Sequence, residues 1–173
     1  AGLQNIKELG GKIWYTGIKF WRPPARDAGG DRRGSRRGAM KRENLSVCLL
    51  NDSFPPQIDG VANAVLNYAR IIQSGPGSAV VGVPDYPGTV DSYPFPVVRY
   101  PSFDTTRLVG YRAGYPFSPR AMDALAAFHP DIIHSHCPVM STVMARALRE
   151  RLDIPVVFTY HTKFDIDIRR ALY

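Results

Sequence analysis

Short runs of hydrophobic residues alternate with segments of helical periodicity from Leu45 to the end of the chain. The runs have the length of strands and are apolar throughout, which is typical of parallel strands buried on both faces. They predict strands at 45–50, 79–83, 96–100, 131–134 and 154–159. The periodic segments predict helices at 61–73, 118–128, 138–151 and 163–172. This alternation predicts an α/β fold with a doubly wound parallel sheet.

Residues 1–39 differ from the rest of the chain. Apolar side chains recur at spacings of three to four over residues 3–21, which indicates an amphipathic helix that three glycines weaken. The Gly/Arg-rich stretch that follows Pro23-Pro24 has no apolar pattern, and we expect it to be disordered. We therefore expect a basic, disordered or partly helical extension at 1–39, followed by one α/β domain at 40–173.

The sequence leaves three origins open for this extension. Arg36-Arg37-Gly38 can be encoded by a purine-rich run that resembles a bacterial ribosome-binding site, and Met40 follows directly. Our first hypothesis is that Met40 is the natural start and that residues 1–39 are a translated leader. The alternatives are an anchor on a membrane surface and a nucleic-acid-binding arm.

The distribution of charged residues along the chain excludes some classes of function. The net charge is +7, but residues 1–39 hold nine of the 22 basic residues and only three of the 15 acidic ones, so the predicted domain is nearly neutral. This excludes a nucleic-acid-binding domain. Neither a signal peptide nor a membrane-spanning apolar run is recognisable, and two cysteines without framework spacing suit a reducing compartment. We expect a cytoplasmic protein.

The loop before the first predicted helix of the domain carries the first candidate site. A buried strand, a loop with Pro55-Pro56 and a glycine at a helix start follow one another, and such a strand end gathers backbone N–H groups and the positive end of the helix dipole. Asp59 is a candidate N-cap, and Gly60 and Val61 would meet a phosphate or a sugar. An ordinary capped loop is an equally open reading.

Histidines end two later strands. On a strand, His134 and His136 face one way and Cys137 the other. Together with His161 they raise the possibility of zinc, but the spacing H-x-H-C matches no standard zinc site, and we expect no metal. We expect one histidine to pack or hydrogen-bond inside the domain and His136 to reach a crevice at the ends of the strands.

Polar groups around His161 form another candidate site. A histidine beside Thr162 and Lys163 can bind a polyol and a phosphate together, and His161 can donate to a leaving phosphate oxygen. The alternative is a polar loop in which Thr162 caps the next helix. In the long loop 100–119, Tyr111 and Arg112 are candidates to grip an acceptor, or its aromatic residues pack the loop down. A hydrolase has no recognisable nucleophile, because no serine-hydrolase elbow, triad order or P-loop is present.

Three segments in order resemble the N-terminal half of retaining glycosyltransferases of the GT-B type, the large family-4 group. They are NDSFPPQIDGVANAVLNYARIIQ, FHPDIIHSHCP and IPVVFTYHTKFD, and the resemblance covers about residues 44–173. It implies a Rossmann-like acceptor-side domain, the catalytic cleft being completed by a donor-binding half beyond Tyr173. It also implies metal-independent transfer of a sugar from a nucleotide-sugar to a lipid, polyol or glycan.

The resemblance also implies roles for individual residues. By position, Gly60, with Asp59 and Val61, matches the loop whose backbone meets the donor, although the family usually has two glycines there. His161 matches the histidine beside the transferred sugar, so it is the catalytic candidate. His136, Thr162 and Lys163 match acceptor-side positions.

Further expectations concern the whole protein. The 173-residue chain should be inactive alone, because the donor half lies outside it. Many lipid glycosyltransferases work at the inner leaflet of the membrane, so we expect peripheral contact with the membrane. We expect no nucleic-acid partner. The alternative function is a stand-alone sugar-phosphate-binding module or accessory subunit without catalysis.

Overall fold

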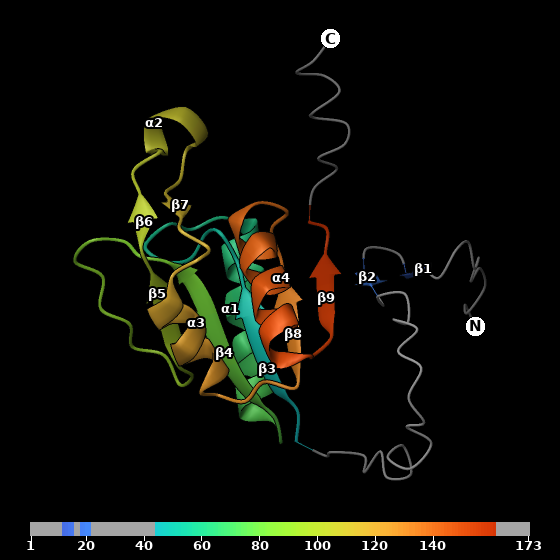
Figure 1. Ribbon diagram of the computed structural model, residues 1–173. Coiled ribbons are helices and arrows are strands. Elements are labelled where there is room, and N and C mark those ends of the chain that lie inside the picture. Colours follow the sequence, from blue (N-terminus) through green and yellow to red (C-terminus); the bar gives the residue numbers. More distant parts are fainter. Residues whose placement is uncertain (1–11, 16–17, 22–43, 162–173) are drawn as a thin grey trace, which may run out of the picture.

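The structure is a computed structural model that describes residues 12–15, 18–21 and 44–161 (Figure 1). Its centre is a parallel sheet with the strand order β9-β8-β3-β4-β5. The strands are Ser46–Leu50 (β3), Ser78–Pro84 (β4), Val97–Tyr100 (β5), Ile132–Ser135 (β8) and Val156–Thr159 (β9). The chain moves outward from β3 to β5 and then returns across the sheet to β8 and β9. This confirms the doubly wound α/β fold, and all five strands end at the same edge of the sheet.

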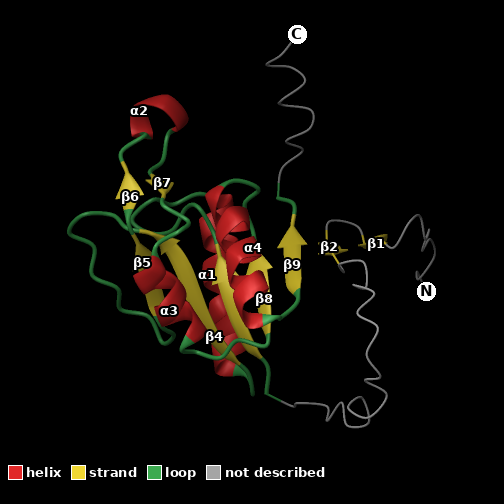
Figure 2. Ribbon diagram, in the orientation of Figure 1, coloured by secondary structure: helices red, strands yellow, loops and turns green. Residues whose placement is uncertain are grey.

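Helices cover both faces of the sheet, as Figure 2 shows. They are α1 (Gly60–Ser74) on one face, and α3 (Pro119–Ala126) and α4 (Met140–Leu152) on the other. Because successive strand residues point to opposite faces, Leu49 packs in the cluster under α1, whereas Leu50 packs in the cluster under α3 and α4. The predicted boundaries of these helices and strands lie within two residues of the observed ones.

Two predicted helix caps are also present. The Asp59 side chain accepts a hydrogen bond of 2.7 Å from the Ala62 amide at the start of α1. Ser118 Oγ accepts one of 3.4 Å from the Ala121 amide, and Pro119 occupies the first turn of α3. In the part of the chain that the structure describes, none of the helices has both the length and the apolar character that a bilayer crossing requires.

The helix predicted within residues 3–21 is wrong where the structure describes them. Lys12–Tyr15 (β1) and Ile18–Trp21 (β2) are antiparallel strands, and β2 pairs with the edge strand β9. Their β-branched and aromatic residues favour strands, and this preference outweighs the weak helical spacing. The other residues of the 1–39 extension and the predicted helix at 163–172 lie outside the described residues.

The loop expected between β5 and α3 has structure of its own. It holds Ser102–Phe103 (β6), the short helix Thr106–Val109 (α2) and Ala113–Gly114 (β7), and β6 pairs with β7 in antiparallel fashion. We call residues 102–114 the hairpin. It projects beyond the edge where the parallel strands end, at the top of Figure 1.

Candidate functional site

A cavity of about 140 Å³ lies where the parallel strands end. Its lining residues follow β3 and β8, lie at the end of β9 or just after it, begin α1 or belong to the hairpin: Asn51, Asp52, Ser53, Asp59, Val61, Tyr111, His136, Cys137, Pro138, Phe158, Thr159, Tyr160 and His161. Residues from the three motifs, although up to about a hundred positions apart, therefore meet in one cavity. This agrees with the rule that open parallel sheets place ligands at the carboxyl ends of their strands.

Five of the predicted site residues line this cavity, namely Asp59, Val61, Tyr111, His136 and His161. Gly60 is the first residue of α1, between two lining residues. Arg112 does not line the cavity. Thr162 and Lys163 lie outside the described residues.

The histidines form a contiguous group across β8 and the end of β9. His134 Nε2 and Thr159 Oγ1 are 2.7 Å apart, which confirms the expected internal hydrogen bond of one histidine. The rings of His134 and His136 lie with their centroids 4.0 Å apart, and both are packed beside Tyr68. His136 Nδ1 and His161 Nε2 are 2.9 Å apart. One of these two nitrogens is protonated, so each imidazole fixes the tautomer of the other.

Burial keeps this group neutral. It lowers the pKa of His136 to about 2 and the pKa of His134 to about 4, with a smaller contribution from the neighbouring histidines. Burial also lowers the pKa of the exposed His161, and the nearby Asp59 carboxylate opposes this shift. At neutral pH the histidines therefore offer hydrogen-bonding nitrogens and no positive charge.

Asp52 connects the end of β3 to the start of α4. Its Oδ1 accepts a hydrogen bond of 2.6 Å from the Ser141 amide, and its Oδ2 accepts one of 3.0 Å from the Met140 amide. Burial raises the pKa of this carboxyl group, and the hydrogen bonds oppose the shift. The carboxylate thus occupies amides at the N-terminus of α4 that would otherwise be free to bind an anion.

Cys137 follows His134 and His136 and lines the same cavity. Its thiol hydrogen-bonds Asp52, and burial together with this carboxylate raises the pKa of the thiol. A thiol that stays protonated is a poor nucleophile, so Cys137 does not support covalent catalysis. Cys48 is the buried core thiol that the sequence predicts, and burial raises its pKa to about 12.

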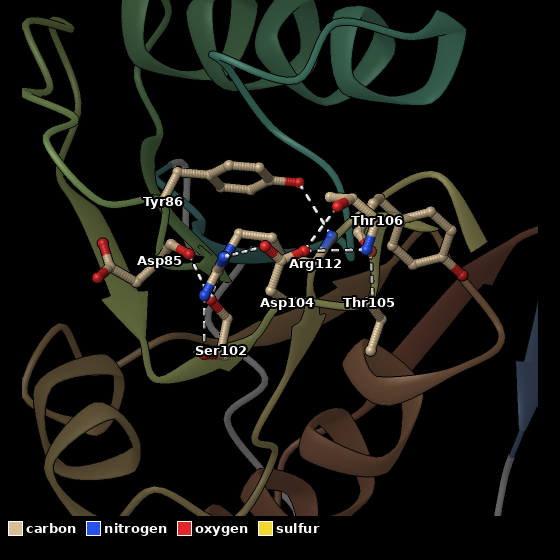
Figure 3. Close-up of polar contacts among 8 residues, drawn as sticks. Asp85, Tyr86, Ser102, Asp104, Thr105, Thr106 and Arg112 are labelled. Atoms are coloured by element: carbon tan, nitrogen blue, oxygen red, sulfur yellow. Dashed lines mark hydrogen bonds and ion pairs between the residues drawn. The ribbon is translucent and has the colours of Figure 1, made fainter. Parts of the chain in front are cut away.

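Arg112 holds the hairpin together (Figure 3). Its Nε donates to Ser102 Oγ at 2.8 Å, its Nη2 donates to the Ser102 carbonyl at 3.1 Å, and its Nη1 lies 3.7 Å from Asp104 Oδ2. The neighbouring Tyr111 is fixed as well, because its carbonyl accepts a hydrogen bond of 2.6 Å from Thr105 Oγ1. Arg112 is thus engaged within the hairpin, whereas Tyr111 lines the cavity.

Arg99 on β5 anchors the loop that leads to α1. Its guanidinium forms a bidentate pair with Asp91, with both N–O distances 2.8 Å, and it also donates to the carbonyls of Pro84 and Pro55. These bonds join the loop after β3 to the long segment between β4 and β5. Arg99 thereby fixes the loop whose two ends carry the lining residues Ser53 and Asp59.

Sequence reasoning missed several lining residues, among them Asn51, Asp52 and Ser53. They are polar, follow a buried strand directly and are less than a tenth exposed. The rule that strand ends carry ligand-binding residues applies to them and could have found them. In contrast, the aromatic lining by Phe158 and Tyr160 depends on how β9 sits beside β8, which no local pattern reveals.

The structure offers little to a metal ion. Among residues 44–161, no group of three or more His, Cys, Asp or Glu side chains is arranged to hold one. The nitrogens that His136 and His161 turn to each other are already hydrogen-bonded.

Comparisons with known proteins agree with this geometry. The chain is 28% identical over 122 residues to a GDP-mannose-dependent alpha-mannosyltransferase of Corynebacterium glutamicum, covering 68% of this chain and 29% of that protein. It is 29% identical over 117 residues to a sulfoquinovosyl transferase of Arabidopsis thaliana, covering 67% and 23%. It is 25% identical over 122 residues to an alpha-monoglucosyldiacylglycerol synthase of Streptococcus pneumoniae, covering 70% and 27%.

These figures mean that the chain spans about a quarter of the length of the curated relatives it matches. Residues 58–173 match the sequence profile of Glycosyltransferase Family 4. The matched segment begins beside the N-cap of α1 and includes Asp59, Tyr111, His136 and His161 of the cavity. Because the match covers more than half of the chain, the protein belongs to Glycosyltransferase Family 4.

Proposed function

We propose that this chain is the acceptor-side, N-terminal part of a retaining glycosyltransferase. The full protein would transfer a sugar from a nucleotide-sugar to a lipid, polyol or glycan acceptor. The observation that carries the proposal is the meeting of Asp59, His136 and His161, from three separate motifs, in one cavity where the parallel strands end. Family membership supports the same reading.

The names of the relatives support the proposed substrate classes. One is described as dependent on GDP-mannose, and another as a synthase of a glucosyldiacylglycerol, a sugar-bearing lipid. These properties belong to those proteins, and we extend only their common part to this chain.

The chemistry would depend on positioning and on neutral hydrogen-bonding groups. In retaining transfer, positive charge develops on the sugar while the diphosphate departs. The enzyme must stabilise this charge and hold the departing diphosphate on one face of the sugar. The proposed catalytic residue, His161, lies at the cavity with its ring oriented by His136. Gly60 carries no side chain at the start of α1, and a side-chain carbon added there would meet no atom within 4 Å. This open space supports its proposed backbone contact with the donor.

We infer that catalysis is complete only in the longer protein. The chain spans about a quarter of the length of its relatives, and the glycosyltransferase reaction needs a donor site as well as an acceptor site. The 173-residue chain should therefore transfer no sugar by itself. We also propose that the reaction needs no metal ion and that the protein works in the cytoplasm, in peripheral contact with the membrane where its acceptor is a lipid.

The test is a transfer assay on the full-length protein, with a panel of nucleotide-sugars and with lipid and glycan acceptors. We expect acceptor-dependent release of a nucleoside diphosphate, unaffected by a chelator, and a product that keeps the anomeric configuration of the donor. His161→Ala should lower kcat about 100-fold or more. His129→Asn is the matched control, because His129 is exposed and does not line the cavity.

Two results would overturn the proposal. One is a full-length protein without acceptor-dependent turnover that nevertheless binds a sugar phosphate, which would favour the stand-alone binding module. The other is an inverted product. Turnover by the 173-residue chain alone would contradict only the inference that the catalytic site is incomplete.

A further inference from the structure

The cavity has an unexpected balance of charge for a family that handles phosphorylated donors. Two carboxylates, Asp52 and Asp59, line it, and the described part of its lining contains no lysine or arginine. Arg112, one cationic candidate from the sequence, is engaged with Ser102 and Asp104 in the hairpin, and Lys163, the other, lies outside the described residues. An anion entering this cavity would face like charge, and none of the described lining residues supplies a compensating cation.

Some of the backbone amides that could bind an anion are engaged as well. The Asp59 carboxylate accepts the Ala62 amide at the start of α1. The Asp52 carboxylate accepts the Met140 and Ser141 amides at the start of α4. Helix N-termini attract phosphate through such free amides. Here both helices that begin at the cavity present a carboxylate in that place.

The histidines do not restore a positive charge. His136 is 2% exposed and His134 is partly buried, and burial holds the pKa of both well below neutral pH. Neutral imidazoles hydrogen-bond hydroxyl groups without attracting anions. His161 and Thr159 add further hydroxyl-compatible groups to the same lining.

One polar atom of the cavity wall lacks a partner. His136 Nε2 is buried and has no hydrogen bond within the described residues, whereas its Nδ1 is shared with His161. Buried polar atoms of this kind are rare, because each costs free energy until a partner is found. Nε2 is therefore an unused hydrogen-bonding atom of a residue that lines the cavity.

The aromatic part of the lining is suited to packing against the face of a sugar ring. Three aromatic residues, Tyr111, Phe158 and Tyr160, line the cavity beside the polar groups. Its volume of about 140 Å³ is close to that of a cavity known to hold one benzene ring, about 150 Å³. A single six-membered ring therefore fits, but a nucleotide does not.

From these observations we propose that the cavity binds one uncharged, hexose-sized polyol ring and discriminates against the same ring when it carries a phosphate. The ring would be the uncharged part of the acceptor, because the transferred sugar arrives with a diphosphate attached. This inference deepens the proposed function and rests on it for the role of the ring. The diphosphate of the donor would lie outside the cavity.

The experiment uses the whole 173-residue chain, isotope-labelled for NMR. D-glucose, D-mannose, their 6-phosphates and inorganic phosphate are titrated separately, and the amide signals of the lining residues are followed. We expect saturable shifts with at least one of the two hexoses and binding at least about tenfold weaker for its 6-phosphate. Inorganic phosphate should leave these signals unchanged.

A charge-changing variant makes the test sharper. Asp59→Asn removes a negative charge but keeps a good N-cap, so α1 should still form. It should reduce the preference for the unphosphorylated hexose. Asp85→Asn is the matched control, because Asp85 is exposed and does not line the cavity, and it should leave the preference unchanged.

Three results would overturn the inference: equal or tighter binding of the 6-phosphate, saturable binding of inorganic phosphate at the lining residues, or no binding of either hexose. An unchanged preference in Asp59→Asn would also count against it. Failure of the proposed function is distinguishable, because it is measured as transfer by the full-length protein. Hexose binding without any transfer would sink the proposed function and leave the selectivity of the cavity intact.

Discussion

The carboxylate of Asp52 accepts a hydrogen bond of 2.6 Å from the backbone amide of Ser141, a residue 89 positions further along the chain. The same carboxylate also accepts from the neighbouring Met140 amide. The start of α4 has no N-cap of its own, since the side chain of Val139 cannot accept a hydrogen bond. Asp52, in the loop that follows β3, therefore acts as the N-cap of α4 and fixes this helix against the end of β3.

We expect Asp52→Ala to destabilise the fold. The loss of a capping side chain costs about 1 to 2 kcal/mol, and the buried amides left behind add to it. Urea denaturation should show a lower midpoint, with Asp52→Asn intermediate because its amide keeps one acceptor oxygen. Asp85→Ala, a change at an exposed aspartate, should leave the midpoint unchanged. Equal midpoints for Asp52→Ala and the parent chain would refute the capping role.

His134 on β8 and His136 just after this strand should make the fold acid-sensitive. Burial lowers the pKa of His134 to about 4 and that of His136 to about 2, whereas unfolded histidine titrates near 6.5. Between these values the unfolded chain binds more protons, so stability is fully present above about pH 6.5 and is lost as pH falls. We expect a loss of about 2 kcal/mol per pH unit between pH 6 and 4.5.

The measurement is the free energy of unfolding at several pH values. His136→Gln should reduce the slope by about half, because one of the two titrating groups is gone. His129→Asn should not change it, since that side chain is exposed. A slope that is the same in His136→Gln and the parent chain would assign the acid sensitivity to other groups.

The sequence predicts the domain well where the information is local. Continuous apolar runs such as 45–50 locate the buried strands, and Asp59 and Ser118 locate helix starts, because strand burial and capping depend on neighbouring residues. The rule that strand ends carry ligand-binding residues also predicts correctly that His136 and His161 lie at the edge where the parallel strands end. These features need no knowledge of distant contacts.

The features that the sequence did not reveal depend on distant contacts or on competing preferences. The cap from Asp52 to Ser141 joins segments that only the folded sheet brings together. Lys12–Tyr15 and Ile18–Trp21 show helical spacing, but they pair as strands at the free edge of β9. The hairpin within 102–114 was expected only as a loop, because its strands are two residues long and Arg112 secures it.

Arg112 should act as a positioning residue for the cavity wall. Arg112→Lys keeps the positive charge but loses the pair of hydrogen bonds to Ser102, because lysine lacks the planar guanidinium that makes both. We expect faster hydrogen exchange at residues 102–114 and weaker hexose binding through a displaced Tyr111, with a global stability change of only about 1 kcal/mol. Arg107→Lys, at an exposed position of the same hairpin, is the control. Unchanged exchange in Arg112→Lys would show that other contacts hold the hairpin.

Gly60→Ala separates the role of the loop in function from its role in folding. A side-chain carbon at Gly60 would meet no protein atom within 4 Å, and alanine is a better helix former than glycine, so we expect stability to be unchanged or slightly higher. If the donor contacts the backbone here, the added methyl group would intrude on it. The full-length protein should then show a KM for the nucleotide-sugar raised about tenfold or more, which corresponds to about 1.4 kcal/mol.

The control for this change lies at the other end of the same helix. Gly75→Ala places a carbon 3.6 Å from the Ile71 and Ile72 carbonyls, which is ordinary contact, and it is far from the lining residues along α1. It should change neither KM nor kcat. If Gly60→Ala behaved like Gly75→Ala in both stability and kinetics, the donor would not pass over the start of α1. The proposed backbone contact between Gly60 and the donor would then have to be abandoned.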